Sequence, residues 1–241
     1  MTISTRQQHI LELLRRNPEI TVYELARCLS VSEPTIRRDF TELERCGYIE
    51  KFYGGAKLLC GAADRTIPFL FRSQEKSTAK VEMGRRAAEL VRNGMVVMLD
   101  ASTSAYNIVP YLAKCEDIIV VTSGAKTAVA LAEMNIRTFC TGGQMITHSF
   151  SYVGKQAEEF VRQFNADIFF FSCHGLTLDG RMTDVSIDEA NLRRVMMQYS
   201  AKKVLLCDSG KIGKTYLYNQ GDAHEVDEII SNVEIVLEKA T

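Results

Sequence analysis

The sequence predicts an α/β protein in two parts, a small winged helix-turn-helix domain followed by a larger domain with a mostly parallel sheet. Two short amphipathic patterns joined by about three residues predict the first part. Continuous apolar runs that alternate with helical stretches predict the second, because strands buried on both faces are typical of parallel sheets. A chain of 241 residues with 46% hydrophobic content can give the larger part a core of its own.

The boundaries of the two parts follow from composition. We expect the first domain at residues 1–57, a linker at 58–74 and the second domain at 75–241. The apolar periodicity fades after the first domain, and the stretch around Gly61–Ala63 and Pro68 has the composition of a linker.

Two helices are expected before the turn. An apolar repeat over residues 10–14 marks a first helix that ends near Asn17-Pro18. The sequence T-V-Y-E at residues 21–24 has the spacing of a capping box, which predicts a second helix beginning at Val22. That helix must stop by Ser30, which leaves room only for a tight turn.

Residues 32–47 predict a third helix, with Ser32 as N-cap, Pro34 in the first turn and Gly47 at the end. Its apolar stripe consists of Ile36, Phe40 and Leu43. Its opposite face carries Pro34, Arg38 and Thr41, with Thr35 and Arg37 on the flanks. This geometry is typical of a recognition helix in the DNA major groove, and a solvated surface helix is the alternative.

A strand over residues 48–53, broken by Gly54-Gly55, predicts a β-ribbon wing after the third helix. The patterns R-x-x-x-I-L-x-L-L, T-V-x-E-L-A, V-S-E-P-T-I-R-R-D and Y-G-G-A cover Arg6 to Ala56. In order and spacing they resemble the N-terminal domain of the DeoR family of bacterial transcriptional regulators, which more often has H-G-G-A. The residues expected to contact operator DNA are Thr21, Ser32, Pro34, Thr35, Arg37, Arg38, Thr41, Lys51 and Tyr53.

The charge of the first domain limits this interpretation. Residues 1–56 contain eight basic and eight acidic side chains and are therefore neutral overall. A strongly cationic domain would bind phosphates without regard to sequence, so here the arginines must act through their placement. We expect modest affinity from one domain, raised when two domains bind a repeated or palindromic site as a homodimer or homotetramer.

The second domain begins with an amphipathic helix and continues with strands. Val81, Gly84, Ala87, Ala88 and Val91 belong to the helix, and Asn93-Gly94 forms the turn after it. The expected strands are Met95–Leu99, Ile118–Val121, Arg137–Cys140, Ile168–Phe171 and Val204–Cys207.

Small polar residues follow each of these strands, and ligands of parallel sheets bind outside the carboxyl ends of the strands. Three hydroxyls in 102–104 open a helix near Ala105, which suits an anion, and Lys211 can reach a phosphate as a point charge. The expected effector-binding residues are Asp100, Ser102, Thr103, Ser104, Thr122, Ser123, Gly142, Gly143, His174, Gly175, Asp184, Glu189 and Lys211. Ordinary turn and cap chemistry is the alternative for any single loop.

The order of these loops is similar to the C-terminal effector domain of the DeoR family, with its D-x-G-T-T, T-N, G-G and D-S-x-K segments. The resemblance implies a fold like ribose-phosphate isomerase and a phosphorylated sugar as effector. Two departures are Ser102 in place of the family's glycine and Ser123 in place of its asparagine. His174 can donate to the effector or be structural, while Asp184 and Glu189 can orient hydroxyls or the lysine; a helix start capped by Ser186 is the alternative for Glu189.

These observations predict a transcriptional regulator, most simply a repressor of a carbohydrate-use operon, and no enzyme. The alternative is a sugar-phosphate isomerase fused to a DNA-binding domain, although the loop at 172–177 offers no carboxylate base. A redox sensor at Cys173 or Cys207 is a third possibility. The seven cysteines are scattered without C-x-x-C spacing, so we expect no disulfide framework, metal or cofactor. Without a signal peptide or a long apolar run, the cytoplasm is the expected location, with no membrane partner.

Overall fold

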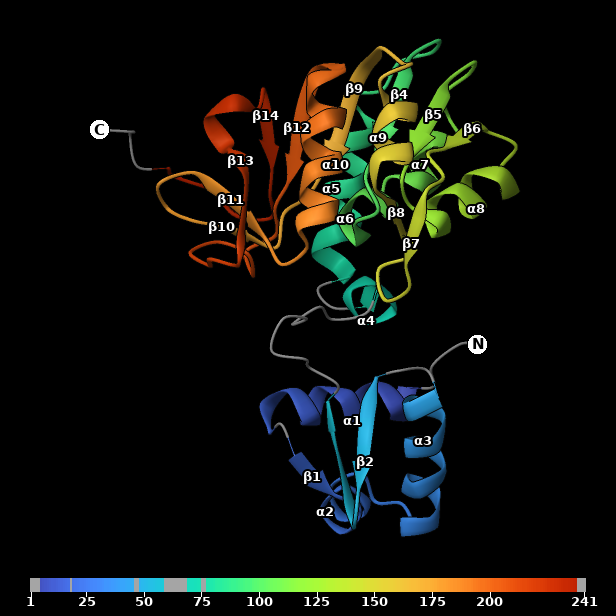
Figure 1. Cartoon of the computed structure of the whole chain (residues 1–241), viewed down its shortest axis with the longest axis vertical. Coiled ribbons are helices and arrows are strands. Elements are labelled where there is room, and N and C mark those ends of the chain that lie inside the picture. Colours follow the sequence, from blue (N-terminus) through green and yellow to red (C-terminus); the bar gives the residue numbers. More distant parts are fainter. Residues whose placement is uncertain (1–4, 18, 46–47, 59–68, 75–76, 238–241) are drawn as a thin grey trace. The chain divides into compact units, whose positions relative to one another are not determined.

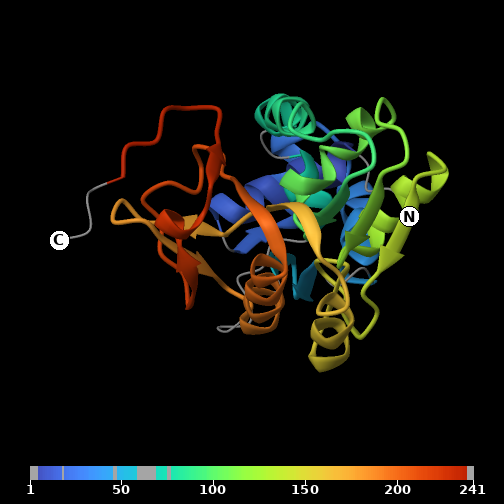
Figure 2. The same ribbon diagram turned by 90° about the horizontal axis from the view of Figure 1, so that it is seen from above.

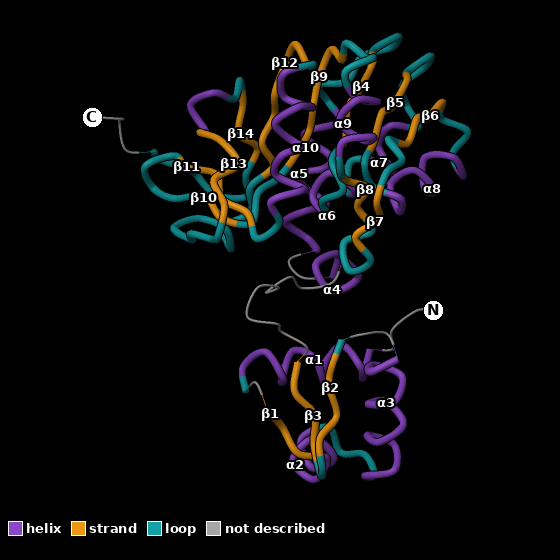
Figure 3. The backbone as a smooth tube through the Cα atoms, viewed as in Figure 1, coloured by secondary structure: helices purple, strands orange, loops and turns teal. Residues whose placement is uncertain are grey.

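The computed structural model describes residues 5–17, 19–45, 48–58, 69–74 and 77–237 (Figure 1). The chain divides into two compact units, Met1–Phe71 and Arg72–Thr241. Figure 3 shows the first unit as helices with a small sheet, and the second as a larger sheet with helices.

Three helices form the first unit: α1 (Thr5–Arg16), α2 (Val22–Cys28) and α3 (Glu33–Arg45). The predicted capping box at Thr21 is confirmed, because its side chain accepts from the Glu24 amide and the Glu24 side chain accepts from the Thr21 amide. The chain then turns at Ser30, whose φ of 54° is left-handed, so two helices are joined by a short turn.

A three-stranded antiparallel sheet completes this unit, with the order β1-β3-β2. Its strands are β1 (Glu19–Thr21), β2 (Ile49–Phe52) and β3 (Gly55–Leu58). Phe52 pairs with Gly55, so β2 and β3 form the predicted wing around a two-residue turn in which Gly54 has a φ of 87°. The third strand, β1, is too short to show a periodicity in the sequence. The predicted helix end at Gly47 lies outside the described residues.

The predicted apolar stripe of α3 is the core of the first unit. Ile36, Phe40 and Leu43 are at most 1% exposed and pack with Ile10 and Leu25 of the other two helices. Because this stripe is buried, the opposite face of α3 is held in contact with solvent.

The second unit is built on a six-stranded sheet of order β14-β12-β9-β4-β5-β6, in which every neighbouring pair is parallel. The strands are β4 (Val96–Leu99), β5 (Ile119–Thr122), β6 (Arg137–Cys140), β9 (Ala166–Phe171), β12 (Ser200–Leu206) and β14 (Glu228–Ile230). The five predicted strands and the predicted fold class are confirmed. The edge strand β14 was not predicted, because three residues carry no readable pattern.

Helices cover both faces of this sheet (Figure 2). On one face lie α5 (Ser77–Ala88), α7 (Val109–Leu112) and α8 (Ala125–Glu133), and on the other α9 (Lys155–Val161) and α10 (Ile187–Gln198). The central strand β4 shows why its run is apolar throughout: Val97 and Leu99 pack in the first core, and Met98 packs in the second.

Smaller elements surround the carboxyl ends of the strands. The short helix α6 (Thr103–Tyr106) follows β4. A second sheet has the order β10-β11-β13, from β10 (Gly175–Leu176), β11 (Arg181–Asp184) and β13 (Tyr218–Asp222). The strands β7 (Gln144–Ile146) and β8 (Ser151–Val153) form a hairpin, and η1 (Ala223–Glu225) is a 3-10 turn.

The structure adds a helix to the predicted linker and corrects one predicted helix boundary. Within the predicted linker at 58–74, the last six residues form the helix α4 (Phe69–Gln74). The predicted helix over Val81 to Val91 is shorter than expected, because α5 ends at Ala88 and Val91 lies beyond it. Val81 lies in α5 but is 44% exposed. Met83 and the predicted Gly84 are buried, and a Cβ at Gly84 would lie 2.2 Å from the Asn107 carbonyl oxygen.

Candidate functional site

The face of α3 for which the sequence predicts DNA contacts is exposed. Arg37 and Arg38 are both exposed, although they differ in their partners. The Arg37 Nη2 lies 3.3 Å from the Glu33 Oε2, whereas Arg38 makes no ion pair with any residue that the structure describes. Arg38 therefore has the more available guanidinium for a bidentate contact with a base.

Other residues predicted to contact DNA are held in place by hydrogen bonds within the first unit. The Ser32 and Thr35 hydroxyls lie 2.9 Å apart, and the Thr41 hydroxyl donates to the Arg37 carbonyl at 2.9 Å. The Lys51 Nζ, on the wing, lies 3.3 Å from the Thr41 Oγ1 and 2.7 Å from Glu44. These bonds orient the polar groups of α3 and the wing toward one surface. The remaining predictions are the exposed Pro34, the fully exposed Tyr53 and Thr21, whose hydroxyl serves the helix cap.

A buried carboxylate that the sequence did not single out anchors α3. Asp39 is 3% exposed and accepts from Arg6 Nε at 2.6 Å and from Arg6 Nη2 at 3.1 Å. Gln7, itself buried, donates to the same carboxylate at 3.2 Å. The hydrogen bonds that Arg6 donates to Asp39 raise the pKa of Arg6 above its ordinary value. This contact fixes α3 against α1.

In the second unit the strand order reverses between β4 and β9, since β5 and β6 continue on one side and β12 and β14 on the other. Such a reversal opens a crevice at the carboxyl ends of the two strands, where ligands of α/β sheets bind. Asp100 follows β4 and Ser172 follows β9, and the Ser172 amide donates to the Asp100 Oδ2 at 3.1 Å. The predicted loops after these strands therefore meet at this point.

Arg193 of α10 lies at the centre of this region and was missed by the sequence analysis. Its side chain is 6% exposed, and its Nε donates to the Asp100 Oδ2 at 2.9 Å. Its Nη1 donates to the Asp184 Oδ2 at 2.5 Å and to the Gln220 Oε1 at 2.9 Å. One guanidinium on α10 is thus bonded to three other segments of the chain.

The ionisation states follow from these contacts. Burial alone would raise the pKa of Asp184, but Arg193, His174 and the Ser186 amide together hold that pKa well below its usual range. Burial alone would lower the pKa of Arg193, but Asp184 and Asp100 raise it above its ordinary value. Both groups therefore stay charged, because each buried charge has an opposite partner.

His174 and Lys211 extend the network toward solvent. The His174 Nδ1 lies 3.1 Å from the Asp184 Oδ2, and burial lowers the pKa of His174 because that carboxylate offsets the burial only in part. The Lys211 Nζ donates to the Ser172 hydroxyl and lies 3.8 Å from Asp208. The His174 imidazole and the Lys211 side chain thus both lie next to residues that follow β9.

The hydroxyl-rich loops lie on the other side of Asp100. Ser102 caps α6, since its hydroxyl accepts from the Ala105 amide at 3.1 Å, and Thr103 is buried beside it. The Ser104 hydroxyl is buried and has no hydrogen-bond partner among the described residues. The loop after β5 packs directly against the loop after β4, because a Cβ at Gly124 would lie 3.1 Å from the Ala101 Cα.

The remaining predicted residues are placed by backbone packing. In the loop after β5, the Thr122 hydroxyl accepts from the Gly124 amide at 3.1 Å, and the Ser123 carbonyl accepts from Tyr152 at 2.8 Å. Gly142 and Gly143 both have positive φ, and a Cβ at Gly143 would lie 2.6 Å from the Val153 carbonyl oxygen. Gly175 is as tightly packed, with the Lys214 carbonyl oxygen 2.3 Å from an added Cβ.

Arg72 is a further residue that the sequence analysis missed, because it lies in the stretch interpreted as linker. It is a half-buried residue of α4, and its carbonyl accepts from the ammonium of the buried Lys80 on α5. Burial lowers the pKa of Arg72, while the charges of Glu189 and Asp184 act in the opposite direction. The arginine therefore lies within electrostatic reach of the site.

The structure bears on the other predicted chemistries. A hydrogen bond with the Cys207 thiol, together with burial, raises the pKa of Cys173 well above its ordinary value, which disfavours the thiolate that oxidation requires. Within the described residues no group of three or more potential metal ligands is found. No helix in that part of the chain is long and apolar enough to cross a bilayer.

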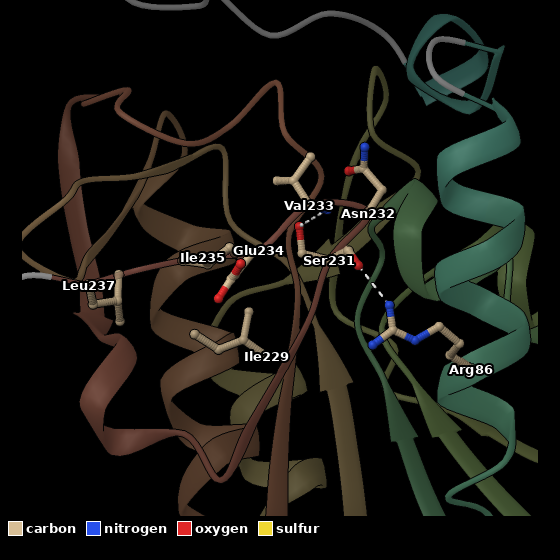
Figure 4. Close-up of a pocket in the computed structure, with 8 residues that line it drawn as sticks. All are labelled: Arg86, Ile229, Ser231, Asn232, Val233, Glu234, Ile235 and Leu237. Atoms are coloured by element: carbon tan, nitrogen blue, oxygen red, sulfur yellow. Dashed lines mark hydrogen bonds between the residues drawn. The ribbon is translucent and has the colours of Figure 1, made fainter.

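A pocket of about 490 Å³ lies apart from these residues, at the outer edge of the sheet (Figure 4). Its lining comes from α5 and from the segment around β14, and the Arg86 Nη1 donates across it to the Ser231 carbonyl at 2.7 Å. It contains none of the predicted effector residues: Arg86, Ile229, Ser231, Asn232, Val233, Glu234, Ile235 and Leu237 line it.

Comparison with known proteins identifies both units. The family model for the DeoR-like helix-turn-helix domain matches residues 6–60, and that for the DeoR C terminal sensor domain matches 75–233. The HTH-type transcriptional regulator GolR of Listeria innocua is 35% identical over 231 residues, covering 95% of this chain and 91% of that protein. The glycerol-3-phosphate regulon repressor of Escherichia coli is 25% identical over 233 residues, covering 96% and 92%.

Solved structures also resemble part of the chain. A ribose 5-phosphate isomerase from Plasmodium falciparum matches with a TM-score of 0.42 and 12% identity, covering 56% of this chain and 52% of that one.

Proposed function

Because the chain belongs to the DeoR family of transcriptional regulators, we propose that it is a cytoplasmic repressor of a carbohydrate-use operon, controlled by a phosphorylated sugar. The observation that carries the effector site is the charged network at the strand-order reversal. Buried ion pairs among Asp100, Asp184 and Arg193 preorganise a polar crevice where ligands of parallel sheets bind.

The DNA end of the proposal rests on α3 and the wing. Arg38, the more available arginine, would read a base in the major groove, while Arg37, Thr35 and Lys51 would contact bases and phosphates near it. A neutral domain binds more tightly when two copies act together, which supports a homodimer or homotetramer on a repeated operator.

Control of DNA binding requires a physical link between the two functions. The helix α4 follows the segment that leaves the DNA-binding unit, and Lys80 ties it to α5. Arg72 on this helix senses the charges of Glu189 and Asp184, so an effector that changes the field there would change the environment of α4. Coupling of this kind is typically ~1–3 kcal/mol and acts equally in both directions.

An isomerase is the competing function, and the two carboxylates that pair with Arg193 are poorly suited to it. Proton abstraction from carbon needs a carboxylate whose pKa is near the working pH. The partners of Asp184 hold its pKa far below that value, and Asp100 is bound by Arg193 and by two backbone amides. We therefore infer a sensor that binds without turnover. Its relatives are regulators as well.

Two assays on the full chain test the proposal. Thermal-shift screening against a panel of phosphorylated sugars and their unphosphorylated forms should reveal a ligand that raises the Tm, because binding to the native state stabilises it. A coupled isomerase assay on the same panel should show no turnover. Stabilisation by no member of the panel, or turnover of one, would overturn the effector role.

A further inference from the structure

We propose that His174 and Glu189 form the end of the effector site that binds sugar hydroxyls, and that the phosphate lies beside the 102–104 loop. The assignment rests on the proposed effector class and adds the orientation of the effector and the residues that select it. We call His174 and Glu189 the acceptor pair.

The hydrogen-bond partners of His174 fix the role of its outer nitrogen. A carboxylate can only accept, so the Nδ1 that lies 3.1 Å from the Asp184 Oδ2 carries the proton. Because burial lowers the pKa of His174, the ring is neutral and Nε2 is an acceptor. This Nε2 is buried and has no hydrogen-bond partner in the part of the chain that the structure describes.

Glu189 presents a second acceptor of the same kind. The residue is 4% exposed, and its Oε2 is buried without a partner among the described residues. Glu189 lies one helical turn before Arg193 on α10, so both side chains project from one face of that helix. The charges of Glu189 and Asp184 both act on Arg72, and those of Arg72 and Arg193 act on His174, which places the acceptor pair in one electrostatic neighbourhood.

Two buried hydrogen-bond acceptors that lack donors favour a ligand that carries hydrogen-bond donors. Buried acceptors are stabilised only when they are hydrogen-bonded, and sugar hydroxyls donate readily. A phosphate ester offers mainly acceptor oxygens, which cannot donate to these two acceptors, and its negative charge would be repelled by the Glu189 carboxylate, whose Oε2 has no partner among the described residues. Asp184 itself has no free oxygen, since Arg193, His174 and the Ser186 amide occupy both.

The 102–104 loop offers a hydrogen-bond donor where the acceptor pair offers only acceptors. The buried Ser104 hydroxyl has no partner in the described structure and can donate to a phosphate oxygen. Asp100, the carboxylate nearest in sequence, is already neutralised by Arg193 and bound by the Ser102 and Ser172 amides. A phosphate is therefore tolerated at this end and disfavoured at the acceptor pair.

The test compares two kinds of ligand on variants of the full chain. For Glu189→Met, we expect the Kd of the best-binding sugar phosphate of the panel to rise roughly 10- to 150-fold, the range for a hydrogen bond to a charged group. The Kd of inorganic phosphate, measured by competition, should stay unchanged or fall, because a repelling charge is removed. Asp188→Asn is the matched control, since Asp188 is exposed in the same helical turn and should leave both constants unchanged.

Two variants of His174 distinguish the contribution of its Nδ1 from that of its Nε2. An asparagine amide reaches the position of Nδ1, and a glutamine amide reaches that of Nε2. We expect His174→Asn to keep the contact with Asp184 but to weaken sugar-phosphate binding roughly tenfold. His174→Gln should retain most of the binding. Thermal melting of each variant verifies that it folds before its affinities are compared.

The outcomes separate this assignment from the proposed function. Equal weakening of sugar phosphate and inorganic phosphate in Glu189→Met would place the phosphate at the acceptor pair and overturn the orientation alone. Unchanged binding in both Glu189→Met and His174→Asn would also overturn it alone. Failure of the unmodified chain to bind any phosphorylated sugar would overturn the effector class and this assignment together.

Discussion

Both units of the protein place an arginine against buried carboxylate, but solvent reaches only one of the two arginines. In the DNA-binding unit the Arg6 side chain is 41% exposed over Asp39, which is 4% exposed. In the sensor unit the Arg193 side chain is 6% exposed and bridges Asp100 and Asp184, which are 1% and 0% exposed. The same ion-pair chemistry thus serves two different kinds of site.

The difference follows from what each unit binds. DNA is a large ligand that approaches a surface, so the first unit needs only one buried anchor and keeps Arg37 and Arg38 in solvent. A small effector must be surrounded, so the sensor unit holds its charges inside before the ligand arrives. Buried charges then become interdependent, and removing one leaves the others uncompensated.

The largest expected effect follows from breaking the sensor network. Arg193→Met leaves Asp100 and Asp184 buried without their cation, so we expect the free energy of unfolding of the sensor unit to fall by about 3–5 kcal/mol. Urea denaturation followed by circular dichroism measures it. Arg181→Met is the matched control, because Arg181 pairs with Asp179 in solvent and should cost under about 1 kcal/mol. Equal losses in the two variants would contradict the comparison.

The next effect concerns DNA rather than stability. Arg38→Ala removes an exposed guanidinium from α3, so we expect operator affinity to fall by about 1–3 kcal/mol, with relaxed preference at one base pair. Fluorescence anisotropy with a duplex selected from a random pool measures the loss. The thermal stability of the variant should match that of the unmodified chain, and unchanged DNA affinity would remove Arg38 from the reading surface.

The anchor of the first unit should matter less than that of the second. Arg6→Met removes two hydrogen bonds from Asp39 but leaves the bond from Gln7, and water can reach the site. We expect the unfolding free energy of the DNA-binding unit to fall by about 1–2 kcal/mol. Urea denaturation of the full chain measures the loss of unfolding free energy in Arg6→Met, which is then compared with the loss in Arg193→Met. A loss as large as that of Arg193→Met would show that exposure of the arginine does not decide the cost.

The smallest effect is a pH dependence in the sensor unit. The pKa of His174 is lowered in the folded state, so below its ordinary value of about 6.5 the unfolded chain binds a proton that the folded chain does not. Stability should therefore be fully present above that pH and fall as the pH drops toward the folded pKa, by at most ~1.4 kcal/mol per pH unit. Urea midpoints between pH 7 and pH 5 should fall less in His174→Asn. An identical slope in both proteins would argue against a neutral buried ring.

The sequence was sufficient wherever the pattern is local. The capping box at Thr21, the α3 stripe and the five apolar strands are all set by neighbours within one element. Asp100 could be singled out for the same reason, since it ends an apolar run. The short strands β1, β10 and β14 could not be predicted, because two or three residues carry no period.

The centre of the site could not be found from the sequence. Arg193 lies among polar residues of α10 and reads as part of a solvated helix face, yet the fold brings it to a carboxylate 93 positions away. Arg72 was hidden in a stretch interpreted as linker. Such contacts depend on how the sheet is ordered, and a single sequence contains no signal for that order.

Control of operator binding by a phosphorylated sugar is the central claim, and one titration tests it directly. The Kd of the full chain for the selected duplex is measured by fluorescence anisotropy, with and without a saturating concentration of the sugar phosphate that gives the largest thermal shift. We expect the Kd to change roughly 5- to 150-fold, and the unphosphorylated sugar to leave it unchanged. A Kd that is the same with the effector bound would contradict the account.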